Sequence, residues 1–177
     1  MTTQELDNIE YTEEIDLQEA GNVARKAIMD FEAMLKEQDG ALIGDNEKCP
    51  LTHTFADGIY VRQIEIPAGM LIVGKIHKHE HPNFLLKGEV LVVTEDGEEY
   101  LEAPCSMISS AGTKRALYSI TDLVWTTIHH NPTNTQDIKE LEDIVIAKSY
   151  DEFDRFVGSK NNLLNRAKRF LIKTLSK

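Results

Sequence analysis

The feature of this chain that most constrains its fold is a series of short apolar segments, separated by turns, between residues 51 and 130. The segments are rich in β-branched, aromatic and other apolar residues, and turn signals such as Pro67-Ala68-Gly69, Glu95-Asp96-Gly97 and Ala111-Gly112-Thr113 separate them. No alternation with helix-length segments, which parallel sheets require, is visible. The sequence therefore predicts a mainly β chain that folds as a jelly roll or barrel. The expected strands are 59–66, 70–77, 84–86, 89–94, 98–102, 106–109, 115–120 and 123–129.

A helix is expected on the N-terminal side of this β region. Apolar residues recur at spacings of three and four from Leu17 to Leu35, which predicts a helix over about 16–38. The residues before it include five acids and no base, which is typical of a flexible tail. We therefore divide the chain into an acidic tail (1–15), a helix with a linker (16–48), a barrel (49–133) and C-terminal helices (134–177).

The C-terminal region is predicted to be helical. Residues 137–142 indicate a short helix, a capping box at Ser149 and Glu152 begins another, and Gly158-Ser159 is expected to end it. A last amphipathic helix is predicted over 162–177.

That last helix is basic, although the chain as a whole is acidic. Residues 159–177 hold six Lys or Arg and no acid, whereas the net charge of the chain is −11. Three interpretations are open. The helix packs its apolar stripe on the barrel, which we favour; it contacts an acidic partner or an anionic membrane surface; or it touches nucleic acid locally.

The composition argues against several classes of protein. A net charge of −11 disfavours general nucleic-acid binding, because phosphate binding needs a basic face. Cys49 and Cys105 cannot form a disulfide framework and are expected to be reduced thiols. No signal peptide or membrane-spanning apolar run is recognisable. We therefore expect a cytoplasmic protein.

The chemistry suggested by the sequence lies in its histidines. His77, His79 and His81 alternate, so an extended strand would place them on one face, with neighbours roughly 6.5–7 Å apart at Cα. The outer two would then be about 13 Å apart, so all three can meet at one ion only if the backbone bends, for which Pro82 is the expected place. His129 ends the last predicted strand. A solvated strand end near a turn is the alternative interpretation of the three close histidines.

The histidine segment resembles the first sequence motif of the cupin superfamily. That motif has a glycine, then His-x-His, then a glutamate, six further residues and a second glycine. Here Gly69, His77-x-His79 and Gly88 stand in this order, and His81 occupies the place of the glutamate, closer to His79 than the motif has it. The resemblance implies a cupin-type double-stranded β-helix, which is a jelly-roll barrel, with α-helices at both ends of the chain.

The second cupin motif has a weaker counterpart. Ser110-Ala111-Gly112 matches its beginning, but Arg115 stands where the motif has its histidine. In a cupin barrel the late strands lie across the interior from the first motif, so His129 is a candidate for the ligand that Arg115 does not supply. The candidate metal site therefore consists of His77, His79, His81 and His129. Its cofactor would be a divalent transition metal ion such as Zn, Fe, Mn or Ni, since neutral imidazole binds all of them.

The stretch from Cys49 to Asn131 is also similar to small cupin-like proteins encoded by tailed bacteriophages. Segments that carry this similarity include Phe55-Ala56-Asp57-Gly58 and Val124-Trp125-Thr126-Thr127-Ile128-His129. The similarity implies an origin, and with it the host cytoplasm as the location. Cupins commonly pair through sheet edges, so a homodimer is expected too.

Two functions from different classes fit these observations. The first is a metal-binding cupin that acts on or binds a small molecule through a histidine cluster inside the barrel. The second is a non-catalytic cupin module that serves ligand binding or assembly in a phage or host complex. In either case Arg115, Arg62 and Tyr118 are the candidate ligand-binding residues, although a surface position is an alternative for Arg62 and Tyr118. The fold alone does not choose between the two.

Overall fold

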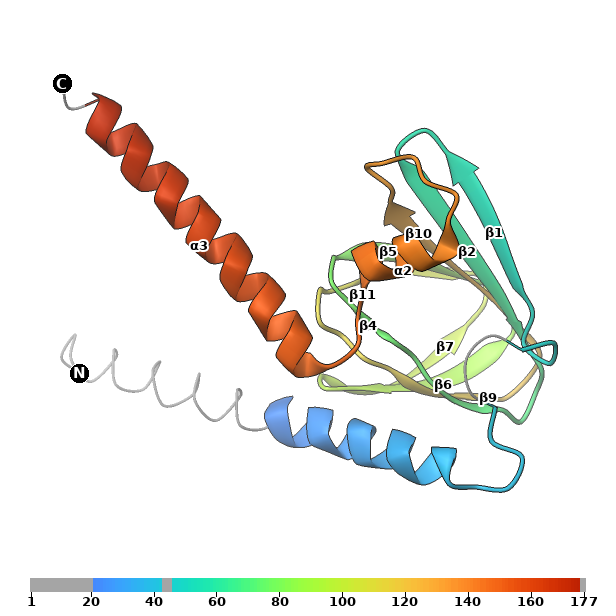
Figure 1. The fold of residues 1–177 in the computed structure, drawn as a ribbon. Coiled ribbons are helices and arrows are strands. Elements are labelled where there is room, and N and C mark those ends of the chain that lie inside the picture. The colour runs from blue at the N-terminus through green and yellow to red at the C-terminus, as the bar shows by residue number, and fades with distance from the viewer. Residues whose placement is uncertain (1–20, 43–45, 176–177) are drawn as a thin grey trace, which may run out of the picture.

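A mainly β region is flanked by helices at both ends of the chain (Figure 1). The computed structural model describes residues 21–42 and 46–175, and for residues 163–175 only the backbone. The first described helix covers residues 21–36, and α2 (Ile138–Val145) and α3 (Tyr150–Leu175) follow the β region. The predicted fold class is therefore confirmed. The predicted acidic tail and the start of the N-terminal helix lie outside the described residues. Within them, no helix has the length and apolar character needed to cross a membrane.

The barrel consists of two antiparallel sheets. In the first the strand order is β1-β2-β10-β5-β8, and in the second it is β3-β9-β6-β7. Strands far apart in the sequence are neighbours in both sheets, as a jelly roll requires. The strands are β1 (Leu51–Ala56), β2 (Ile59–Ile66), β3 (Leu71–Val73), β5 (His81–Lys87), β6 (Glu89–Thr94), β7 (Gly97–Glu102), β8 (Cys105–Ser109), β9 (Ala116–Ser119) and β10 (Leu123–His130).

A separate two-stranded ribbon pairs β4 (Ile76–His77) with β11 (Ile146–Ala147). The sequence predicted one strand over 70–77 and only helices after the barrel. The structure instead ends β3 at Val73 and joins β4 to the C-terminal region. The ribbon thereby ties the first histidine of the candidate site to the segment between α2 and α3.

The predicted break at Gly158-Ser159 is wrong, because α3 continues through both residues. A glycine inside a helix costs about 1 kcal/mol relative to alanine, which lowers helix stability without ending the helix. The Ser159 hydroxyl donates a hydrogen bond of 2.8 Å to the Phe156 carbonyl and so joins the helical backbone.

The inward side chains of the first sheet form layers along the barrel axis, because side chains alternate between the two faces of each strand. One layer is apolar, and its paired positions are Leu51, Ile64, Trp125 and Leu85. The next layer is polar and contains His53, Arg62, Thr127 and Asn83. The third contains Phe55, Tyr60 and His129. One end of the barrel is therefore filled by core, and the other end presents imidazoles.

The apolar end supplies the main hydrophobic core. Leu85 and Val90 are fully buried, and Leu123 and Trp125 are nearly so. Full burial of a side chain of this size stabilises the fold by about 1.5–3 kcal/mol. The core lies apart from the histidines, so it can hold the barrel without filling the candidate site.

Two helices hold the loop that joins β8 to β9. From the N-terminal helix, Glu32 forms an ion pair of 3.1 Å with Lys114, whose side chain is almost fully buried. From α3, the ring of Phe153 packs at Gly112, where the backbone has φ +88°. The Gly112 amide also donates a hydrogen bond of 2.8 Å to the His77 carbonyl. The helices therefore support the loop on which one end of the site depends.

Beyond its first turns α3 runs away from the barrel (Figure 1). The side chains of residues 163–177, which form the basic amphipathic segment, lie outside the described part. The described backbone of this segment does not lie on the barrel, so the favoured packing of its apolar stripe there is not seen in this structure.

The close contact at Gly112 predicts a large effect of a small substitution. A Cβ at Gly112 would lie 2.6 Å from the Phe153 ring, whereas a Cβ at Gly69, with φ +79°, would meet nothing within 4 Å. Both alanine variants carry a left-handed backbone penalty of roughly 1–2 kcal/mol. Gly112→Ala should lose about 1–3 kcal/mol more through overpacking. Denaturant unfolding checks this, and equal losses for Gly112→Ala and Gly69→Ala would contradict the contact.

Candidate metal centre

Three histidines from three strands meet at the polar end of the barrel. They are His77 on β4, His81 on β5 and His129 on β10, and one potential ligand atom from each lies within 4.8 Å of the others. Their ring centroids are 4.2, 5.0 and 4.6 Å apart. Two nitrogens bound to one zinc ion at about 2.0–2.1 Å stand roughly 3.3 Å apart. Small side-chain rotations would therefore let all three imidazoles reach one ion.

A bend between β4 and β5 brings His77 and His81 together. The chain bends at Lys78 and His79, so the expected bend is present, although Pro82 lies within β5 and is not its site. The bend turns the ring of His79 away from the group, and that ring lies edge-on against Phe156 of α3 at 5.2 Å. Of the four predicted ligands, the structure therefore brings three together and leaves His79 outside.

The hydrogen bond of His81 leaves one of its nitrogens ready to bind a metal. Its Nδ1 lies 3.1 Å from the His79 carbonyl oxygen, and since a carbonyl only accepts, Nδ1 carries the proton. The lone pair is then on Nε2, which is buried with no hydrogen-bond partner among the described residues. A buried imidazole nitrogen without a donor fits a metal ligand held in place by its second nitrogen.

His129 and His77 also have a ring nitrogen that can bind a metal. His129 Nε2 lies 3.0 Å from the Thr127 hydroxyl, whose own proton goes to the Arg62 carbonyl. Nε2 therefore donates, and the lone pair of His129 is on Nδ1. In His77, Nδ1 is buried without a hydrogen-bond partner in the described part of the chain. The donor set thus fits a metal ion.

Burial keeps these imidazoles neutral. Loss of hydration lowers the pKa of His77 well below its ordinary value and lowers that of His81 as well. Burial, with His81 and Arg62 nearby, lowers the pKa of His129 to about 3. Metal binding requires the neutral form, so no proton has to be displaced at neutral pH.

Two predicted ligand-binding arginines lie close to the imidazoles. Arg115 immediately precedes β9, and its Nη2 donates a hydrogen bond of 2.5 Å to the Ser109 hydroxyl. Burial lowers the pKa of Arg115, and the charge of Arg115 in turn helps to lower the pKa of His77 and of His81. Arg62 projects from β2 in the polar layer, and its charge helps to lower the pKa of His77 and of His129.

The third predicted ligand-binding residue, Tyr118, is not brought to the site. It is 41% exposed, and it pairs with Leu71 and Leu91, which are exposed as well. These side chains therefore form part of the outer face of the second sheet.

Several side chains that support the site were not predicted from the sequence. The ring of Tyr60 stacks on His129 with centroids 5.9 Å apart, and its hydroxyl lies 2.7 Å from His53 Nδ1. Asn83 donates a hydrogen bond of 2.5 Å to Ser109 and accepts one of 3.0 Å from Trp125 Nε1. Strand alternation would have placed Tyr60 on the face of Arg62, but only the pairing of β2 with β10 brings it to His129.

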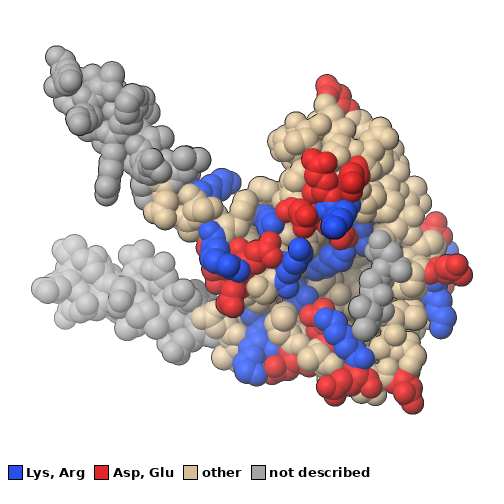
Figure 2. All heavy atoms as spheres, in the orientation of Figure 1, with Lys and Arg blue, Asp and Glu red and all other residues tan. Residues whose placement is uncertain are grey.

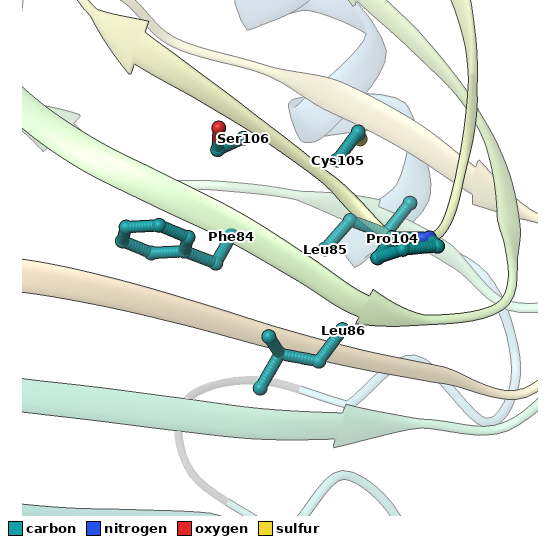
Figure 3. Close-up of a pocket in the computed structure, with 6 residues that line it drawn as sticks. All are labelled: Phe84, Leu85, Leu86, Pro104, Cys105 and Ser106. Atoms are coloured by element: carbon teal, nitrogen blue, oxygen red, sulfur yellow. The ribbon is translucent and has the colours of Figure 1, made fainter.

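Two cavities lie near or within the barrel. A cavity of about 180 Å³ is bordered by Arg115, Ser109 and Glu99. Another of about 220 Å³ lies where β5 meets the start of β8, as Figure 3 shows, and it contains no histidine or arginine. Its lining residues are Phe84, Leu85, Leu86, Pro104, Cys105 and Ser106. Only the first cavity adjoins a residue of the candidate site. Cys49 and Cys105 are both free thiols, as predicted.

Comparison with known proteins finds similarity in structure only. No protein-family model and no curated protein matches the sequence. A cupin superfamily protein from Desulfitobacterium hafniense DCB-2 is 11% identical with a TM-score of 0.42, over 51% of this chain and 84% of that chain. Ectoine synthase from P. lautus is 12% identical with a TM-score of 0.46, over 56% of this chain and 75% of that chain. The Schizosaccharomyces pombe Cnp3 cupin domain is 14% identical with a TM-score of 0.42, over 50% of this chain and 69% of that chain. Cupin superfamily proteins are thus among the solved structures that this chain resembles.

The lowered histidine pKa values predict a pH dependence of the metal-free protein. An unfolded histidine takes up a proton near pH 6.5, whereas folded His129 does so near pH 3. The unfolded state therefore binds more protons between these values, so the contribution of His129 to the free energy of unfolding is constant above about pH 6.5 and falls below it.

Denaturant unfolding of chelator-treated protein at pH 7 and pH 5 measures this loss. It should be smaller by about 1–2 kcal/mol in His129→Gln than in the wild type. The exposed neighbour His130 provides the control, because His130→Gln should keep the wild-type difference. An unchanged pH dependence in His129→Gln would show that His129 is not buried in its neutral form.

Proposed function

We propose that this protein is a metal-binding cupin, in which His77, His81 and His129 hold one divalent transition metal ion and a small molecule binds beside it. The observation that carries the proposal is the meeting of three neutral imidazoles, two of them buried and that of His77 half-buried. His77 and His81 each have one buried ring nitrogen without a partner among the described residues. Buried nitrogens of this kind would be costly unless something binds them.

Three protein ligands suit a site that works on a small molecule. A fourth protein ligand would complete a tetrahedral structural site, whereas three leave a position open for water or a ligand. Within the described residues, no other His, Cys, Asp or Glu joins the three histidines. Imidazole donors suit Zn, Fe, Mn or Ni. When bound, such an ion would polarise an oxygen of the ligand, while Arg115 and Arg62 would orient it. The bacteriophage origin and the cytoplasmic location stay expectations from the sequence.

Metal content tests the proposal directly. Full-length protein incubated with Zn, Fe, Mn or Ni salts and then desalted should retain close to one ion per chain by elemental analysis. His129→Ala should weaken binding at least about tenfold, because loss of a supporting residue around a metal already costs 10–100-fold. His130→Ala and His79→Ala are matched controls and should retain the ion. Wild-type protein that stays metal-free with all four salts would overturn the proposal.

A second candidate function, assembly, is favoured by the outer face of the second sheet. A row of exposed apolar side chains crosses all four strands there, each paired with the next across the sheet. The row is Leu71, Tyr118, Leu91 and Tyr100, and these side chains are 41–51% exposed. Contiguous apolar surface of this kind marks interaction sites more often than isolated apolar residues do.

We propose a second copy of this chain as the partner for this apolar row. A two-fold symmetric pairing would place the same row against itself and would cover it in both copies. The exposed Glu98 and Glu102 flank the row on β7, so a symmetric pairing has to leave these carboxylates at the solvated rim of the contact. The basic C-terminal segment remains available in this arrangement for an acidic partner or a membrane surface.

Light scattering at micromolar concentration tests the assembly. The wild type should have twice the chain mass of 20.0 kDa. Leu91→Asp should shift the protein towards monomer, because it would bring two carboxylates together within an apolar contact. Ile108→Asp is the control, since Ile108 is 62% exposed on the other sheet and should not affect the dimer. A monomeric wild type would contradict the pairing.

A further inference from the structure

We propose that the small molecule bound at this site is an oxyanion, a compact carboxylate or phosphate compound, which Arg115 and Arg62 hold beside the metal position. The inference rests on the proposed metal function and adds the chemical class of the ligand. It starts from the charges that surround the three imidazoles.

The polar end of the barrel holds positive charge without a matching carboxylate. Arg62 lies in the polar layer opposite Thr127, and Arg115 donates a hydrogen bond to Ser109, which is the register partner of His81. In the described part of the chain, neither arginine has a carboxylate within ion-pair distance. A divalent ion would add two further positive charges.

Buried charge of one sign is costly when nothing compensates it. The polar layer next to the histidines consists of His53, Arg62, Thr127 and Asn83, and none of these is acidic. Burial lowers the pKa of Arg115, and Glu95 and Glu99 oppose this effect only from beyond ion-pair distance. The chain as a whole is acidic, and on the face shown in Figure 2 Lys and Arg atoms lie interspersed with Asp and Glu atoms. An anionic ligand would provide the missing charge.

The guanidinium of Arg115 is also positioned to bind an oxyanion. One nitrogen is held by Ser109, whose hydroxyl is itself bonded to Asn83, and Asn83 to the Trp125 indole. This chain of hydrogen bonds orients the planar group. A guanidinium has five N–H donors, and the structure shows one side-chain hydrogen bond from Arg115. The remaining donors can bind two oxygens of one carboxylate or phosphate group.

The available space limits the size of the ligand. The cavity next to Arg115 measures about 180 Å³. Pockets for drug-sized molecules are about 300–1,000 Å³, so a compact metabolite fits and a large one does not. Asp96 and Glu99 border this cavity on the side of β7, so an anionic group would bind towards Arg115 and Ser109 on the opposite side.

Calorimetric titration of the full-length, metal-loaded protein tests the proposal. The probes are malonate, inorganic phosphate and 1,3-propanediol, which is a neutral analogue of malonate in length. Malonate or phosphate should bind, and propanediol should not. Whichever anion binds more tightly identifies the oxyanion group. Arg115→Gln should weaken its binding at least about tenfold, and Arg62→Gln with Arg115→Gln should abolish it.

The variants are designed to separate charge, geometry and folding. Arg155→Gln, at an exposed position on α3, is the matched control and should bind the anion like the wild type. Arg115→Lys keeps the charge but loses the planar fork, so it should bind with intermediate affinity, and it serves as the test if Arg115→Gln does not fold. Each variant should retain its metal ion, because none of these residues is a ligand.

The outcomes distinguish this inference from the proposed metal function. A wild type that binds metal but binds propanediol as tightly as malonate, or binds neither anion, overturns the oxyanion site alone. Equal anion affinity in the wild type and in the variant that lacks both arginines would also overturn the oxyanion site alone. A wild type that binds no metal overturns the metal function. The same titration of that metal-free protein then decides whether the arginines bind an anion by themselves.

Discussion

The register of β10 between β2 and β5 is the constraint on which the rest of the structure depends. Leu123 and Trp125 are buried in the apolar half of the strand, and the side-chain period of two then turns Thr127 and His129 to the same interior face. A shift by one residue would expose the two apolar side chains and turn His129 outwards. Each apolar side chain contributes about 1.5–3 kcal/mol when buried, so the hydrophobic half of β10 determines where its polar half points.

The helices stabilise the imidazole end of the barrel, which the apolar core does not reach. The apolar cluster around Leu85 and Val90 lies at one end, and the imidazole end has polar or charged interior residues. There the loop between β8 and β9 is held from outside, by the ion pair of Lys114 with Glu32 and by the contact of Gly112 with Phe153. That loop carries Arg115 and binds the His77 carbonyl, so the helical ends help to position the candidate site.

The electrostatic character of the site is opposite to that of the chain. Thirty acidic residues give the protein its net negative charge, yet the groups next to the histidine triad are two guanidiniums. The imidazoles can remain close together because burial keeps them neutral. A metal ion held by these neutral nitrogens would add to the positive charge of the arginines, and an anion bound beside it would compensate both.

The sequence by itself determined the β architecture, the helices at both ends and the histidine segment as the candidate site. These follow from local patterns, such as strand alternation, turn residues and the spacing of His77, His79 and His81. Only the tertiary structure decided that the backbone bends at Lys78 and His79, that His79 is thereby turned to Phe156, and that Tyr118 faces outwards. The physical reason is that a ligand set or a binding face arises from pairings between strands far apart in the chain. Local periodicity places a side chain on one of two faces, but it does not reveal which other strand lies opposite.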